Sequence, residues 1–207
     1  MLRRLVFAAA VSFSLLLSAC ATMPAPIENV ANRAIYLPFG MHITPDSATN
    51  PIEPPERFSG YHVGLDLEVS GEERETDVPA FAICAGSVVS SGFAEGYGGL
   101  LVQRCTLDDE PVTVLYGHLS IDNLPAKDAQ LAAGQRIGIL ADANSRDSGG
   151  NRKHLHLGIH RGTDIDIRGY VQTEREIAEF IDPLSILRDR VLVVPGQTIE
   201  PYWRTSK

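Results

Sequence analysis

Two short segments of this chain alternate chemistry-bearing and apolar side chains with a period of two. The first covers residues 62–66 (HVGLD) and the second covers residues 154–157 (HLHL). Successive side chains on a strand point to opposite faces, so each segment would bury its aliphatic residues and present its polar residues on the other face. Gly64 disfavours a helix interior, and the strict alternation favours strands over an i, i+4 helical pair. The two segments therefore predict a β fold with an open polar face.

The polar positions of these segments suit a single metal site. Two imidazoles and one carboxylate are ligand types that catalytic zinc favours, and a fourth position is then left for water. An isolated histidine at the end of a strand can also be purely structural, and this alternative applies to His118. Taken as a set, however, five residues fit one zinc site: His62, Asp66, His118, His154 and His156.

The N-terminus has the features of a secretory signal. Two arginines at positions 3 and 4 precede an apolar run over residues 5–17, which is too short for a membrane-spanning helix. Residues 17–20 (LSAC) resemble the bacterial lipobox, which implies cleavage before Cys20 and lipidation of that thiol. An ordinary signal peptide with an incidental cysteine is the alternative. Ala21, where aspartate would retain a lipoprotein at the inner membrane, indicates the periplasmic side of the outer membrane in a Gram-negative bacterium.

Two cysteines remain after Cys20. Cys84 and Cys105 lie in two apolar segments that a turn-rich stretch over residues 95–99 joins. In an oxidising compartment, paired strands would bring them together as a disulfide, which is worth about 3 kcal/mol for a loop of this size. Two buried free thiols are the alternative.

Charge excludes one class of partner. The formal net charge of −8 becomes −10 when residues 1–19, with their two arginines, are removed. A chain this acidic lacks the electrostatic footprint of a nucleic-acid-binding protein. It also gains no long-range attraction to an anionic polymer, so substrate capture would depend on a shaped groove.

Several short stretches together resemble the lysostaphin/LytM-type zinc endopeptidases, which cut peptide stems or cross-bridges of bacterial peptidoglycan. The stretches follow the order of the family between residues 58 and 187. They are residues 62–66 (HVGLD), 97–99 (YGG), 116–120 (YGHLS), 133–138 (AGQRIG), 154–157 (HLHL) and 182–184 (DPL). The resemblance implies a compact antiparallel β-sandwich with an active-site groove on one sheet.

The resemblance also implies a role for each member of the histidine and aspartate set. His62, Asp66 and His156 would bind one zinc ion per chain, while His118 and His154 would be the catalytic imidazoles beside the metal. Neutral-to-charged imidazole can accept and donate protons near pH 7, but which of the two is the general base stays open. Two other functions also stay open: a non-enzymatic LytM-like regulator of another wall hydrolase, and a zinc peptidase that acts on proteins.

These inferences predict the organisation of the chain. We expect a signal peptide (residues 1–19), a lipidated Cys20 with a tether (20–34), an irregular segment (35–60), a metallopeptidase domain (61–190) and a C-terminal extension (191–207). A single helix over residues 173–180 is expected to end before Pro183. The loop over residues 144–153 and the charged insert over residues 164–168 depart from the family pattern and are expected to border the groove. The irregular segment could also block the open zinc position in a latent form.

Overall fold

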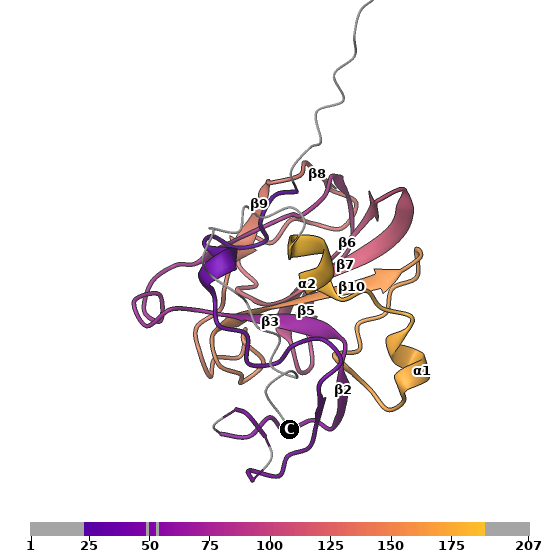
Figure 1. Cartoon of the computed structure of the whole chain (residues 1–207). Helices are drawn as coiled ribbons and strands as arrows, with labels where there is room; N and C mark the ends of the chain where they lie inside the picture. The colour runs from indigo at the N-terminus through magenta and orange to yellow at the C-terminus, as the bar shows by residue number, and fades with distance from the viewer. Residues whose placement is uncertain (1–22, 49, 53, 189–207) are drawn as a thin grey trace, which may run out of the picture.

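The computed structural model describes residues 23–48, 50–52 and 54–188, and Figure 1 shows how its strands are arranged. Cys20, the signal sequence and residues 191–207 lie outside the described residues. Within them strands are the predominant regular structure, and every strand pairing is antiparallel, which confirms the predicted fold class. No helix in the described part of the chain is long and apolar enough to cross a bilayer.

A six-stranded sheet with the order β3-β10-β7-β6-β5-β8 forms the main layer. Its members are β3 (Gly64–Glu68), β5 (Gly86–Ala94), β6 (Gly98–Leu107), β7 (Glu110–Leu119), β8 (Gln130–Leu131) and β10 (His154–Arg161). A two-stranded sheet pairs β4 (Pro79–Phe81) with β9 (Arg136–Ile139), and buried residues of both sheets pack in one hydrophobic core. A three-stranded sheet, with the order β1-β2-β11, consists of β1 (His42–Ile43), β2 (Gly60–His62) and β11 (Tyr170–Val171).

Strand β10 lies between β3 and β7 and carries the predicted alternation. Leu155, Leu157 and Ile159 belong to the hydrophobic core, while His154 and His156 line a cavity on the other face of the sheet. His156 is opposite Asp66 in the register of β3 and β10. The strand thus places an apolar and a polar face where the period-two pattern predicted them.

The chain changes sheets within the first motif. Residues 62–66 are not one strand, because β2 ends at His62 and β3 begins at Gly64. At the break, the Val63 amide donates a 3.0 Å hydrogen bond to the carbonyl oxygen of Gly169. His62 is paired with Tyr170 in one sheet, and Asp66 is paired with His156 in another. The site therefore spans the junction of two sheets.

The prediction of a single helix was wrong. The expected helix is short, α1 (Glu174–Ile177), with Thr173 and Glu176 forming a capping box. A second helix, α2 (Pro183–Arg188), begins at the proline that was expected to stop one. Proline is favoured at the first helical position, where its missing N–H has no intrahelical partner to lose.

The segment expected to be a tether is packed where the structure describes it. Met23 and Ile27 are buried in the main core, and Ile27 bridges to Ala80 of β4. Arg33 forms a 2.7 Å ion pair with Glu73, and a short 3₁₀ helix, η1 (Val30–Asn32), lies between these contacts. Residues 23–34 are thus part of the folded domain, because their aliphatic side chains complete its core.

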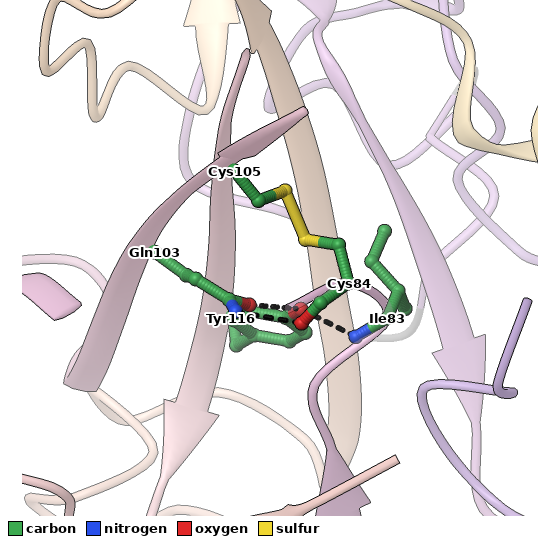
Figure 2. The surroundings of a disulfide bond; sticks show 5 residues. All are labelled: Ile83, Cys84, Gln103, Cys105 and Tyr116. Atoms are coloured by element: carbon green, nitrogen blue, oxygen red, sulfur yellow. Dashed lines mark hydrogen bonds between the residues drawn. A yellow bond between two sulfur atoms is a disulfide. The ribbon is translucent and has the colours of Figure 1, made fainter. Parts of the chain in front are cut away.

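Cys84 and Cys105 form the predicted disulfide, shown in Figure 2. A buried polar network accompanies it: the Ile83 amide donates to the Tyr116 hydroxyl at 2.9 Å, and this hydroxyl donates to Gln103 Oε1 at 3.1 Å. Gln103 Nε2 in turn donates to the carbonyl oxygen of Cys84 at 2.8 Å. Disulfide and network together fasten the segment before β5 to β6 and β7.

Candidate metal centre

All five residues of the predicted set meet on one side of the six-stranded sheet. Each is buried, with at most 5% of its surface exposed. Asp66, His118, His154 and His156 line a cavity of about 300 Å³, while His62 lies behind His156 with the two rings edge to face. The structure therefore brings together every residue that the sequence singled out for this site.

Three donor atoms converge at the centre of the set. His156 Nδ1 lies 3.0 Å from Asp66 Oδ1 and 3.1 Å from His62 Nε2, and His62 Nε2 lies 3.4 Å from the same carboxylate oxygen. A Cβ atom at Gly64 would overlap the His156 ring, so only glycine leaves this position open. Two imidazole nitrogens and a carboxylate oxygen within 4.8 Å of one another fit a zinc ion.

Electrostatics keep the carboxyl group of the set ionised. Burial acts to raise the pKa of Asp66, but the neighbouring His154 and His62 rings and hydrogen bonds from His154 and His156 hold it well below its usual range. Burial lowers the pKa of His156 to about 4, against the opposing effect of Asp66. An ionised carboxylate beside a neutral imidazole is the protonation state that metal binding requires.

His118 reaches the cavity through a β-bulge near the end of β7. Leu119 and Gly117 are paired with consecutive residues of β6, so His118 is the extra residue of the bulge, and its φ of 62° is left-handed. A Cβ at Gly99 on β6 would overlap the Leu119 carbonyl oxygen. Bulges re-aim side chains, and non-glycine residues with left-handed backbone are concentrated at functional sites.

Two of the histidines also have a hydrogen bond that fixes the ring. His118 Nδ1 donates to the Ser148 carbonyl oxygen at 2.9 Å, and His154 Nδ1 donates to the Arg152 carbonyl oxygen at 2.9 Å. The second nitrogen of His154 lies 3.2 Å from Asp66 Oδ2. Burial, together with the nearby His154 and His156, lowers the pKa of His118 well below its usual value, so this ring is neutral near pH 7.

Two further residues of the site had no predicted role. The Tyr97 hydroxyl lies 3.5 Å from His156 Nε2, and burial, with Asp66 nearby, raises the pKa of this phenol, so it stays protonated. Arg152 Nη2 donates to Asp66 Oδ2 at 2.8 Å. The sequence contained a hint for each residue, because Tyr97 is the first residue of one family-like stretch and Arg152 lies two residues before His154.

The segments that were expected to border the cavity do so. Asn151 of the loop over residues 144–153 lines it, as do Ile167 and Arg168 of the charged insert. Aromatic walls come from Phe58 and Tyr170, whose rings are stacked with centroids 5.6 Å apart.

Among the described residues, one other group has metal-ligand geometry: His160, Asp166 and Glu179. Its two carboxylates are already held by Arg168, at 2.6 Å from Asp166 and 3.1 Å from Glu179. Asp66 is also paired with an arginine, but only through Oδ2, and its Oδ1 faces His156 at 3.0 Å. The first group has in addition two buried imidazoles, whereas the second has a single, half-buried one, so the first group is the better metal site.

The sequence of the chain matches a known protein family. The sequence profile described as Peptidase family M23 matches residues 60–167, a stretch that contains all five residues of the set. No curated protein sequence matches the chain.

Solved structures that are similar to the chain include the following three. CbpA from L. salivarius REN is 21% identical, with 74% of this chain and 84% of that chain covered and a TM-score of 0.45. LytU is 20% identical, with 76% and 86% covered and a TM-score of 0.47. Helicobacter pylori Csd3 is 19% identical, with 81% and 40% covered and a TM-score of 0.45, so the chain spans less than half of that protein.

Proposed function

Because the chain belongs to peptidase family M23, we propose that it is a zinc-dependent endopeptidase that hydrolyses peptide bonds in the stems or cross-links of peptidoglycan. One observation carries the proposal: His62 Nε2, Asp66 Oδ1 and His156 Nδ1 converge beside two further imidazoles, and all of these residues except His62 line one cavity. A set with three ligands and adjacent acid–base groups is the arrangement of a catalytic, rather than a structural, zinc site.

His62, Asp66 and His156 would hold one zinc ion per chain. Zinc, when bound, supplies Lewis-acid chemistry that polarises a peptide carbonyl group and activates water. The low pKa of Asp66 and of His156 supports this assignment, because neither ligand has to lose a proton near pH 7.

His118 is the better placed of the two catalytic histidines to accept a proton. Its Nδ1 donates to Ser148, which leaves Nε2 as the basic nitrogen of a neutral ring at the cavity. His154 differs because both of its nitrogens face acceptors, the Arg152 carbonyl oxygen and Asp66 Oδ2, so neither nitrogen is left free to act as a base. We therefore assign the general base to His118 and proton donation to His154.

Tyr97 provides a hydrogen-bond donor at the same place. Its phenol is buried and protonated, lies on the cavity wall and is close to His156. A donor so positioned can bind a substrate oxygen as negative charge develops on it.

The groove supports an extended peptide as the substrate. Aromatic rings of Phe58 and Tyr170 form apolar walls against which a peptide can pack. Because the chain is acidic, long-range electrostatic attraction would not bring an anionic polymer to the site, so binding would depend on these walls. The peptide stems of peptidoglycan are extended and accessible, so they would fit such a groove better than the folded backbone of a globular protein would. A protease of denatured proteins is the competing substrate assignment.

We further propose that Cys20 is lipidated and holds the enzyme on the periplasmic side of the outer membrane. The lipobox-like sequence over residues 17–20 supports this location. When cells are fed radiolabelled palmitate, the wild-type protein should carry the label and the Cys20→Ala variant should not, because the Cys20 thiol is the proposed site of acylation. A wild-type protein without label, or equal labelling of the variant, would refute the anchor without bearing on the peptidase.

The deciding experiment combines elemental analysis of the soluble form beginning at Ala21 with digestion of purified cross-linked muropeptides. About one zinc per chain with cleaved cross-links is the expected result. Zinc without cleavage of muropeptides, but with cleavage of denatured protein, would favour the protein substrate. A metal-free chain that cleaves neither would favour the non-enzymatic regulator.

A further inference from the structure

The two oxygens of the Asp66 carboxylate have separate sets of partners. Oδ1 faces His156 Nδ1 at 3.0 Å and His62 Nε2 at 3.4 Å, so this oxygen belongs to the candidate metal site. Oδ2 accepts a hydrogen bond from Arg152 Nη2 at 2.8 Å and lies 3.2 Å from His154 Nε2. A carboxylate held at Oδ2 can offer a metal only its Oδ1.

The Arg152 guanidinium is itself fixed by a second carboxylate. Its Nε donates to both oxygens of Glu68 at 3.0 Å, and its Nη2 donates to Glu68 Oε1 at 2.6 Å. Glu68 follows Asp66 by two residues on β3, so both side chains lie on the same face of the sheet. Nη1 also lies 3.8 Å from Glu56 Oε2. The planar fork of arginine, which lysine lacks, suits this bridge between neighbouring carboxylates.

Charge explains why the bridge matters. Asp66, Glu68 and Glu56 are all buried, and Arg152 is the cation that contacts all three. Without it, the carboxylates of Asp66 and Glu68 would repel each other on one face of β3, and Oδ2 of Asp66 would keep only His154 as a partner. Ligands in protein metal sites are commonly oriented by such outer contacts.

We propose that Arg152 is a positioning residue that holds Asp66 as a one-oxygen metal ligand and is anchored for this purpose by Glu68. The inference rests on the proposed function only in that it requires a metal at His62, Asp66 and His156. The loop over residues 144–153 departs from the family-like pattern partly through its basic residues, and the proposal gives one of them, Arg152, a role.

The test measures zinc affinity on the full chain in detergent, by competition with a chromogenic chelator and without any substrate. Arg152→Met should weaken zinc binding about 10- to 100-fold, and Arg152→Lys should recover part of the loss. Arg161→Met is the matched control, because Arg161 lies on β10 in an exposed ion pair with Glu110 and should bind zinc as the wild type does. The melting temperature of each metal-free variant separates a lost ligand geometry from a lost fold.

Removal of Arg152 leaves Glu68 buried without its cation, which could prevent folding. The double variant Arg152→Met/Glu68→Gln removes that charge and should fold while retaining weak zinc binding. Cobalt substitution adds a spectroscopic readout, since visible absorption bands that differ from those of the wild type would report altered ligation. Zinc affinity within twofold of the wild type in the double variant, with unchanged cobalt bands, would overturn the proposal.

The two proposals fail in different ways. A wild-type chain that binds zinc but cleaves no wall peptide would refute the proposed function and leave the role of Arg152 standing. A wild-type chain that binds no zinc would overturn both.

Discussion

His118 Nδ1 donates a 2.9 Å hydrogen bond to the carbonyl oxygen of Ser148, a residue 30 positions later in the chain. Because a carbonyl oxygen only accepts, this contact determines which nitrogen of the ring carries the proton. The loop over residues 144–153 thereby sets the chemistry of a histidine on a different strand. The loop over residues 144–153 and the β-bulge at His118 therefore together determine the orientation and the tautomer of this ring.

Replacement of His118 by asparagine should leave zinc binding intact and reduce cleavage of muropeptides by about 10²- to 10⁴-fold, the usual contribution of a general base. Asparagine is chosen because it tolerates the left-handed backbone that His118 adopts. The measurements are metal content and initial rate. His42→Asn is the control, since His42 is exposed and its ring contacts Tyr61 outside the cavity. A rate for His118→Asn close to that of the control would contradict the assignment.

Replacement of His156 by alanine should abolish both zinc retention and cleavage. His156 Nδ1 contacts both other candidate ligands, so its loss leaves only His62 and Asp66. Elemental analysis after dialysis, together with a muropeptide digest, checks the result. Persistent activity in this variant would eliminate the proposed site.

The metal-free protein should lose stability as the pH falls from about 6.5 towards 4. Burial lowers the pKa of His156 to about 4 and that of His118 well below its usual value, whereas both rings titrate near 6.5 in the unfolded chain. In this window the unfolded chain binds more protons, so the free energy of unfolding decreases by about 1.4 kcal/mol per pH unit for each extra proton.

This pH effect is measured by urea unfolding with a chelator present at several pH values. Above pH 6.5 these two histidines should contribute no slope. The His118→Asn variant should give a shallower slope between pH 4 and 6.5, because one of the two protons is removed. Stability that is constant, or that rises, as the pH falls through this window would contradict the prediction.

Replacement of Tyr116 by phenylalanine should destabilise the fold by about 1–3 kcal/mol, because it leaves the Ile83 amide and Gln103 Oε1 buried without their shared partner. Urea unfolding at pH 7.5 measures the change. Tyr36→Phe is the matched control, since Tyr36 is 52% exposed and should change the free energy of unfolding by less than about 0.5 kcal/mol. Equal effects of the two substitutions would show that the network contributes nothing.

The period-two alternation of the sequence predicted much of the site, because the face on which a side chain lies depends only on its position along its own strand. The alternation around His156 fixes which side chains share a face of β10, and this holds whichever strands become its neighbours. The disulfide between Cys84 and Cys105 was predicted for a similar reason, since two apolar segments joined by a turn tend to pair.

What the sequence did not predict depends on contacts between distant segments. The break at Val63 is stabilised by Gly169, and the bulge at His118 exists only in the register of β7 against β6. The Arg152 bridge requires β3 and the loop before β10 to meet. Pro183 was misjudged because a proline that ends one helix and a proline that begins the next follow the same local rule.

If Cys20 is lipidated as proposed, the burial of Met23 limits how far from the membrane the active site could lie. The expected tether of residues 20–34 would have given a reach of about 45–50 Å, but Met23 and Ile27 are part of the core. With Cys20 lipidated as proposed, only two residues separate the anchor from Met23, and the Cα atoms of residues 20 and 23 can be at most about 10 Å apart. Pro24 lies beside Gly134, in the turn between β8 and β9, and these strands are at the end of the domain away from β2 (Figure 1). A peptidase anchored in this way would reach only the peptidoglycan that lies closest to its membrane, and more distant peptidoglycan would stay uncut even if the active site were fully active.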